Sequence, residues 1–263
     1  MKLTKAQIKA HKEAEALIDC GRPLKDEEKE FVLDNWQEAA THINSAAGAF
    51  FTPRGLAGDF AIEVNGSSCD AGPCIDLCAG IGSLGYAVEH RFKRMVCVEV
   101  NPDYARIGRR ILPDAEWIVC SVFDPRVLQL GRFSWAISNP PFGRIKSPDY
   151  RGQYTGAEFE YRVIELASRI ADFGAFILPQ MSAPFRYSGR QCFEAEESDK
   201  ARKFREQTGI VMEPNCGIDT SLYSKEWRGV APVCEIVVCE FERPRVAEAP
   251  ALDLFGQPLE VAA

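Results

Sequence analysis

Two short motifs carry residue types that could do chemistry, and the more informative one is Asn139-Pro140-Pro141-Phe142. Asn139 offers a side-chain carbonyl, Pro140 a backbone carbonyl and Phe142 a flat apolar ring. The two prolines fix φ and remove two backbone donors, so the chain leaves the preceding strand along a stiff path. Two acceptors beside an aromatic ring suit a planar group with an exocyclic NH2, because each N–H can donate to one acceptor. The motif predicts chemistry on an amine, and it indicates the reaction better than the substrate.

The second motif is a glycine-rich loop that follows an apolar run. Gly80, Gly82 and Gly85 have the GxGxxG spacing of a dinucleotide-binding turn, and Glu99 follows 19 residues after Gly80. Glycines permit a tight turn and a close approach of the ligand, and the carboxylate can accept hydrogen bonds from both ribose hydroxyls. Taken alone, this pattern fits a nicotinamide-dependent oxidoreductase about as well as a methyltransferase.

Asp76 separates these two interpretations. A loop that binds pyrophosphate needs backbone N–H donors and no anion beside the phosphates. A carboxylate four residues before Gly80 instead suits a ligand with an ammonium group, such as the methionine part of S-adenosylmethionine. The position of Asp76 therefore favours the methyl donor.

With these motifs, residues 48–242 resemble the class I S-adenosylmethionine-dependent amino-methyltransferases, specifically the N6-adenine DNA methyltransferases with an NPPF motif. The resemblance implies that Asn139, Pro140 and Phe142 are catalytic and that S-adenosylmethionine is the cofactor. Ser121 stands where the family usually has an Asp beside the cofactor adenine, and Asp124 is an alternative for that position. The cofactor-binding residues implied by the resemblance are Phe51, Thr52, Asp76, Ala79, Gly80, Gly82, Glu99, Ser121 and Asn139.

Phe50-Phe51-Thr52-Pro53 resembles the family's amino-terminal cofactor motif. Thr52 is expected to be the N-cap, and Pro53 the first-turn proline, of a helix that reaches Glu63. A cofactor motif before the catalytic motif is the gamma-like order. Gamma enzymes usually carry a large recognition domain after the catalytic core, and only a short segment follows the core here. Recognition is therefore expected to be minimal, or to come from residues 184–200 or the N-terminal helices, with the relaxed specificity of some phage and mobile-element enzymes.

The elements that position these motifs alternate between strand and helix patterns, which predicts an α/β fold with a doubly wound, mostly parallel sheet. The last two apolar runs have no helix between them, so they are expected to form an antiparallel closing hairpin. Together with the resemblance, this gives a seven-stranded class I methyltransferase fold. The predicted strands are 73–79, 94–100, 116–122, 133–138, 173–178, 210–213 and 233–241, and the predicted helices are 83–91, 102–111 and 158–171.

The chain is expected to have three parts: an N-terminal helical extension (1–45), a methyltransferase domain (46–243) and a flexible C-terminal tail (244–263). Within the extension, apolar residues recur at helical spacing and predict a second helix over 26–41. The polar stretch 188–200 is expected to be an exposed loop.

Composition narrows the function classes. Hydrophobic residues make up 46% and charged residues 26%, which excludes wholesale disorder. No apolar run reaches the roughly 18 residues of a membrane span, and no secretory signal is visible. Most of the ten cysteines lie in apolar strand-like stretches, which indicates reduced thiols in a cytoplasmic protein. There is no CxxC and there are only three histidines, so no metal site is expected.

Several alternatives remain open. Similar motifs occur in enzymes that methylate adenine or guanine amines in RNA, and in enzymes that methylate a protein glutamine amide, which is the weaker alternative. A cytosine C5 methyltransferase needs a Pro-Cys in its catalytic loop, but the one Pro-Cys here, Pro73-Cys74, begins the first strand. A methyltransferase-like binding module is disfavoured by the intact Asp76, Glu99 and Asn139.

DNA is the expected partner, with RNA as the alternative. The net charge of −7 argues against a purely electrostatic nucleic-acid binder but permits local basic surfaces. The basic residues expected to contact phosphates are Arg144, Lys146, Arg151, Arg186 and Arg190.

The tail contains a second candidate partner site. Ala251-Leu252-Asp253-Leu254-Phe255 resembles the peptide by which bacterial DNA-processing proteins bind the sliding clamp, although Ala251 replaces the usual Gln. Leu252, Leu254 and Phe255 could insert into a hydrophobic pocket of the clamp. Alternatively, the segment folds back over the protein's own apolar surface.

Overall fold

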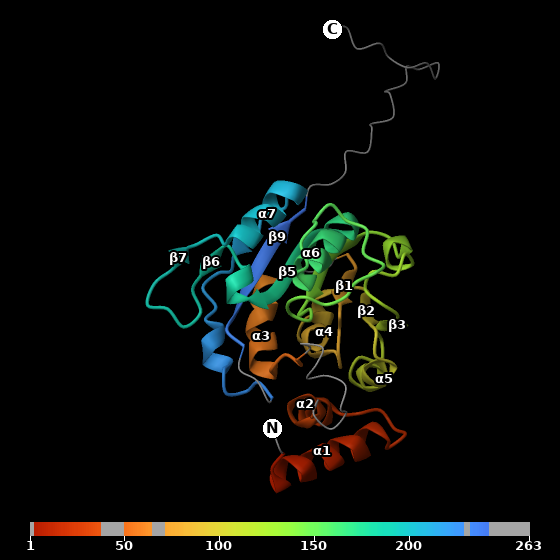
Figure 1. Cartoon of the computed structure of the whole chain (residues 1–263). Helices are drawn as coiled ribbons and strands as arrows, with labels where there is room; N and C mark the ends of the chain where they lie inside the picture. Colours follow the sequence, from red (N-terminus) through yellow and green to blue (C-terminus); the bar gives the residue numbers. More distant parts are fainter. Residues whose placement is uncertain (1–2, 38–49, 65–71, 229–231, 242–263) are drawn as a thin grey trace, which may run out of the picture.

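A seven-stranded sheet forms the centre of the molecule (Figure 1), with the strand order β3-β2-β1-β4-β5-β9-β8. The computed structural model describes residues 3–37, 50–64, 72–228 and 232–241. β3, β2, β1, β4 and β5 are parallel, whereas β9 runs antiparallel between β5 and β8. This confirms the predicted doubly wound sheet with an antiparallel closing pair. Its strands are β1 (Cys74–Leu77), β2 (Met95–Glu99), β3 (Glu116–Val119), β4 (Phe133–Ser138), β5 (Ala171–Pro179), β8 (Glu213–Pro214) and β9 (Cys234–Glu240).

Helices cover both faces of this sheet and enclose two cores. One core lies between the sheet and α3, α4 and α5, and the other between the sheet and α6 and α7. Successive strand residues alternate between the cores, as the pleat of a strand requires: Cys97 faces the first core, whereas Val96 and Val98 face the second. The helices are α1 (Lys5–Ile18), α2 (Asp26–Asn35), α3 (Arg54–Glu63), α4 (Ser83–Val88), α5 (Pro102–Ile111), α6 (Phe159–Ile170) and α7 (Asp199–Thr208).

Smaller elements complete the described part of the chain. A two-stranded hairpin, β6 (Phe185–Arg186) with β7 (Glu194–Ala195), extends from the body beyond β5 (Figure 1). In the described residues, no helix combines the length and the apolar character needed to cross a membrane. Short 3-10 helices lie at Glu89–Arg91, Val127–Gln129, Gln180–Ser182 and Thr220–Tyr223.

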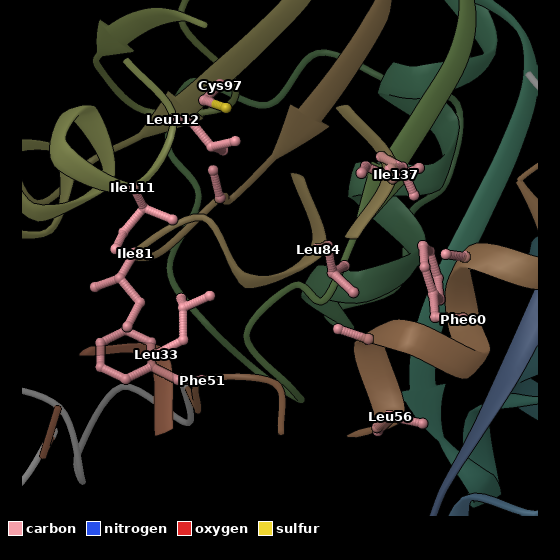
Figure 2. Packing of buried hydrophobic residues seen from close by; sticks show 14 of the residues in the cluster. Leu33, Phe51, Leu56, Phe60, Ile81, Leu84, Cys97, Ile111, Leu112 and Ile137 are labelled. Atoms are coloured by element: carbon pink, nitrogen blue, oxygen red, sulfur yellow. The ribbon is translucent and has the colours of Figure 1, made fainter. Parts of the chain in front are cut away.

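The two N-terminal helices pack on the first core. Figure 2 shows Leu33 of α2 beside Phe51 and Ile81, and all three belong to that core. The Arg228 guanidinium donates to the backbone carbonyls of Trp36, at 2.7 Å, and of Leu33. These contacts bind the end of α2 to the main body. The predicted domain boundaries at 45/46 and 243/244 lie outside the described residues.

Two helix predictions differ from the structure. α2 ends at Asn35 instead of continuing toward residue 41, because Trp36 adopts an extended conformation in which Arg228 holds its carbonyl. Residues 38–41 lie outside the described part. Thr52 is not the N-cap of α3: Pro53 occupies that position without a side-chain cap, and the Thr52 hydroxyl bonds to Asn139 instead.

The stretch predicted as an exposed loop, 188–200, contains β7 and the first two residues of α7. α7 was not predicted because it buries only Ala201 and Phe204, which is too few apolar residues for a clear periodicity. Its ends do have ordinary signals, since the Ser198 hydroxyl caps the first turn and Gly209 ends the helix with φ of 73°. The predicted strand at 210–213 is two residues long in the structure, β8, and begins only at Glu213.

Candidate active site

The three polar residues of the motifs meet at one edge of the sheet. β2, β1 and β4 are parallel neighbours, so Asp76, Glu99 and Asn139 all lie at or just beyond carboxyl ends of adjacent strands. Ligands bind at this edge in open α/β sheets. Two cavities adjoin here, of about 320 Å³ and about 20 Å³. The larger lies within the roughly 300–1,000 Å³ of small-molecule sites.

The predicted cofactor residues divide between these cavities. Of the predicted cofactor residues, Gly82 lines neither cavity, and the predicted catalytic residues Pro140 and Phe142 also line neither. The larger cavity is lined by Phe51, Gly80, Glu99, Ser121 and Asn139, and the smaller by Phe51, Thr52, Asp76, Ala79, Gly80 and Asn139.

The glycine loop adopts a backbone conformation that requires glycine at two positions. Gly80 has φ of 58° and Gly82 has φ of 92°, in the left-handed region that favours glycine. A Cβ on Gly80 would lie 3.3 Å from the Phe51 ring, which itself meets Tyr104 edge to face at 4.9 Å. Phe51 thus closes over the loop, so Gly80 serves both the turn and this close approach. Cys78 also has a positive φ, 67°, and lines both cavities.

Asp76 is a buried carboxylate with an unmet oxygen. It is 1% exposed, and Oδ2 accepts from the backbone N–H of Gly85 at 3.2 Å. Oδ1 has no hydrogen-bond partner among the described residues. Burial raises the pKa of Asp76 to about 8, which reflects the cost of a buried charge without a counter-ion. The smaller cavity beside it holds roughly one water-sized group, the size of an ammonium, so the residues present fit the cationic end of an amino acid.

Glu99 differs in that both oxygens are held. Oε2 accepts from the backbone N–H of Gly80 and Oε1 from that of Asn101, each at 2.8 Å. Burial raises the pKa of Glu99, while these backbone donors oppose the shift. The two backbone donors fix the orientation of the carboxylate, and Glu99 lines the larger cavity. Each oxygen keeps a second lone pair, so the carboxylate can still accept from two hydroxyls. The apolar side chains of Val100, Val122 and Pro141 line the same cavity and suit a flat ring.

Asn139 connects the two cavities. Its Nδ2 donates to the backbone carbonyl of Phe50 at 3.0 Å and to the Thr52 hydroxyl at 2.9 Å. No hydrogen bond to its Oδ1 occurs within the described part of the chain. The amide oxygen is thus available at the point where both cavities meet. Phe142, three residues on, is half-buried against the first core.

A buried glutamate that was not predicted holds the loop after the Asn139–Phe142 motif. Glu160, in the first turn of α6, is 1% exposed; Oε2 accepts from the backbone N–H of Gly143 at 2.9 Å and Oε1 from the Ser182 hydroxyl at 2.8 Å. Burial raises the pKa of Glu160. The only local signal is an acidic residue near a helix start, which is common and therefore uninformative.

Of the two residues considered for the position beside the cofactor adenine, Ser121 lines the larger cavity and Asp124 does not. The Ser121 hydroxyl accepts from the backbone N–H of Phe123 at 3.2 Å. Asp124 lines neither cavity and is bound by the Arg126 guanidinium at 2.8 Å, which lowers the pKa of Asp124 to about 2.

The five predicted phosphate contacts have different surroundings. Lys146 lines the larger cavity, and Arg144 is exposed nearby. Arg151 donates to backbone carbonyls of its own loop. Arg186 pairs with Glu196 at 2.7 Å, whereas Arg190 is exposed on the β6–β7 hairpin. The candidate clamp residues Leu252, Leu254 and Phe255 lie outside the described residues.

Sequence reasoning missed other members of the larger cavity. Most directly follow or precede a recognised motif residue, as Val100 follows Glu99 and Val122 follows Ser121, so adjacency was the available signal. In the described residues no cluster of His, Cys, Asp or Glu is placed to hold a metal ion. The missed residues of the larger cavity are Phe50, Cys78, Val98, Val100, Asn101, Tyr104, Cys120, Val122, Pro141, Ile145 and Phe159.

Comparisons with known proteins identify the fold. No protein-family model and no curated protein matches the sequence. A candidate RNA methyltransferase from Pyrococcus horikoshii aligns with a TM-score of 0.52 and 17% identity, over 83% of this chain and 98% of its own. A candidate class I S-adenosylmethionine-dependent methyltransferase from Listeria monocytogenes aligns with a TM-score of 0.54 and 12% identity, over 93% of this chain and 83% of its own. The M protein of the type I restriction enzyme EcoKI aligns with a TM-score of 0.51 and 12% identity, over 90% of this chain and 55% of that protein. The chain has the class I methyltransferase fold, as predicted.

Proposed function

We propose that this protein transfers a methyl group from S-adenosylmethionine to the exocyclic N6 amine of adenine in DNA. The observation that carries the proposal is the position of Asn139. It stands at the carboxyl end of β4, where the two cavities meet, and its amide oxygen has no donor within the described part of the chain. An acceptor in that place suits a substrate nitrogen that carries hydrogens.

The residues around the cavities fit the cofactor. S-adenosylmethionine supplies a methyl group on a positively charged sulfur, which makes that carbon electrophilic. The unmet Oδ1 of Asp76 would bind the ammonium group, and the oriented carboxylate of Glu99 would accept from the ribose hydroxyls. Val100 and Val122 would hold the adenine ring between apolar surfaces. An ammonium group satisfies Asp76, which a pyrophosphate would not, so the buried acid supports a methyl donor over a dinucleotide.

Two acceptors of this chain would hold the substrate amine. Asn139 Oδ1 and the Pro140 carbonyl accept one N–H each, which directs the nitrogen lone pair out of the ring plane and toward the methyl group. As the nitrogen forms its bond to the methyl carbon, the bond from that carbon to sulfur breaks and its electron pair stays on sulfur. The amine then loses one proton to solvent. Because a stacked base hides this amine, the adenine must leave the helix, and the Phe142 ring would support it by stacking.

The choice of DNA over RNA rests on the motif resemblance, and the structural neighbours include both kinds of protein. The EcoKI M protein belongs to a restriction enzyme, and the Pyrococcus horikoshii protein is a candidate RNA methyltransferase. An amine of adenine or guanine in RNA is therefore the second candidate substrate.

Substitution of Asn139 tests the proposed role. Asn139→Ala should lower the rate of methyl transfer at least ~100-fold, the scale of losing one preorganised polar group, while the variant still binds S-adenosylmethionine. Near wild-type turnover of Asn139→Ala would contradict the assignment.

Phe142→Trp should retain substantial activity, whereas Phe142→Ala should weaken capture of the base by about 1–3 kcal/mol. Equal activities of these two Phe142 variants would show that the ring only packs against the core.

A further inference from the structure

We infer that the Thr52 hydroxyl and the Phe50 backbone carbonyl are positioning groups that fix Asn139 as a hydrogen-bond acceptor toward the substrate. The inference rests on the proposed function and deepens it, because it assigns a role to a segment 87–89 residues away in sequence. In this arrangement the substrate must present a donor to Asn139, and a keto oxygen in the same place is rejected.

The first step is the orientation of the amide. A backbone carbonyl can only accept, so the Asn139 atom 3.0 Å from the Phe50 oxygen must be the nitrogen and not the oxygen. The Thr52 hydroxyl takes the second amide hydrogen at 2.9 Å. Both hydrogens of the amide are then used by protein acceptors, and Oδ1 is left to face the cavities.

The second step is the cost of the opposite orientation. A flipped amide would place Oδ1 against the Phe50 carbonyl oxygen, two acceptors at hydrogen-bond distance, and would turn two donors toward a substrate amine that can only donate. Thr52 alone could not prevent the flip, because a hydroxyl both donates and accepts. Phe50 therefore sets the direction, and Thr52 holds the remaining hydrogen.

The third step is the placement of Thr52. It is 5% exposed and lies one residue before Pro53, the N-cap of α3, so its hydroxyl does not cap the helix. The helix start has no side-chain cap, so the hydroxyl is free for Asn139. Thr52 also lines the smaller cavity with Asp76. One segment thus borders the proposed cofactor site and holds the proposed catalytic amide.

A pair of substitutions at Thr52 tests the inference. Thr52→Val removes the acceptor at similar volume, and Thr52→Ser keeps it. We expect Thr52→Val to lower kcat on duplex DNA roughly five- to tenfold, the scale of one hydrogen bond, and Thr52→Ser to restore most of it. Both variants should melt near the wild-type temperature. Because Thr52 also lines the smaller cavity, the affinity for S-adenosylmethionine is measured separately by calorimetry, and kcat is compared at saturating cofactor, where it reports the effect on Asn139.

A second readout would not respond to a merely structural role. In Asn139→Asp one carboxylate oxygen must face the Phe50 carbonyl, so the site is formed well only when the carboxyl is protonated and donates to that carbonyl. Relative to wild type at saturating cofactor, activity of Asn139→Asp should therefore rise as the pH falls from about 8 to about 6. Adding Thr52→Val removes a hydroxyl that could donate to the ionised carboxylate and should move this rise to higher pH. Other titratable residues line the cavities, and comparison with the wild type at each pH accounts for their titration. These residues are Asp76, Cys78, Glu99, Tyr104, Cys120 and Lys146.

The outcomes are distinct. Wild-type kcat in Thr52→Val, or a pH profile of Asn139→Asp that Thr52→Val does not move, would overturn the positioning role while methyl transfer by the wild type stands. Loss in both Thr52→Val and Thr52→Ser would also overturn it. A wild-type protein that binds S-adenosylmethionine but methylates neither DNA nor RNA would instead overturn the proposed function.

Discussion

Asp76 and Glu235 are both fully buried carboxylates on central strands, yet their surroundings differ. Glu235 on β9 accepts four hydrogen bonds: from the backbone N–H groups of Tyr187 and Ser188, at 2.8 and 2.9 Å, and from the side chains of Gln180 and Ser188, at 2.6 and 2.8 Å. Asp76 accepts one, at 3.2 Å, and has an unmet oxygen. A buried polar group with a purely structural role normally has its hydrogen-bond partners within the protein. A saturated carboxylate therefore indicates an anchor for a loop, and an unsaturated one beside a cavity indicates a ligand site.

The largest expected effect is on the anchor. Glu235→Ala leaves four donors without their acceptor, so it should lower the free energy of unfolding by about 3 kcal/mol or more. Chemical denaturation measures this. Glu240→Gln, an exposed position on the same strand, is the matched control and should stay within about 0.5 kcal/mol of wild type. A small loss in Glu235→Ala would mean that saturation does not distinguish an anchor.

Next in size is the effect of Asp76→Asn on cofactor binding. The variant keeps the shape of the side chain but loses the charge, so affinity for S-adenosylmethionine should fall roughly 10- to 100-fold, the scale of a charge-assisted hydrogen bond. Isothermal titration calorimetry measures it. Asp124→Asn, in which the acid is bound to Arg126 away from both cavities, serves as control. Unchanged affinity in Asp76→Asn would remove the basis for calling Asp76 a ligand site.

The pH dependence of stability should also differ between wild type and Asp76→Asn. The pKa of Asp76 is raised from 3.8 to about 8, so the folded apoprotein retains a proton that the unfolded chain has released. The resulting stabilisation is complete below about pH 4, declines as the pH rises and is lost above about pH 8, with a limiting slope of about 1.4 kcal/mol per pH unit. Denaturation of both proteins at several pH values checks this: the wild type should lose more stability on the way to pH 8. Parallel curves would contradict an uncompensated buried acid.

The smallest effect is expected at Glu160, which combines features of both carboxylates. Its oxygens are satisfied by Gly143 and Ser182, yet Gly143 directly follows the proposed catalytic motif. Glu160→Gln keeps one acceptor, and its amide can donate to the Ser182 hydroxyl, so kcat should fall only about two- to fivefold. Steady-state kinetics on duplex DNA provides the measurement. A loss above about 100-fold in a folded variant would show that Glu160 acts on the substrate itself.

The sequence predicted the features that depend on neighbouring residues, and it did not predict contacts between residues far apart in the chain. β4 and α5 were predicted to the residue, because an apolar run that ends at Asn-Pro-Pro and an Asn-Pro helix start are local signals. The common edge of Asp76, Glu99 and Asn139 followed from parallel strands. The bonds of Asn139 to Thr52 and of Glu235 to Ser188 were not predicted, since they join residues 87 and 47 positions apart through loops whose paths no local pattern fixes.

Methyl transfer with identification of the product base tests the central claim most directly. The protein is incubated with S-adenosylmethionine carrying a labelled methyl group, together with duplex DNA or total RNA, and each nucleic acid is digested to nucleosides. The account predicts label in N6-methyladenine from the DNA, and an initial rate of labelling at least ~100-fold lower when Asn139→Ala replaces the wild type. Label only in RNA would contradict the choice of DNA, and label in a base carbon such as cytosine C5 would contradict the amine chemistry assigned to Asn139.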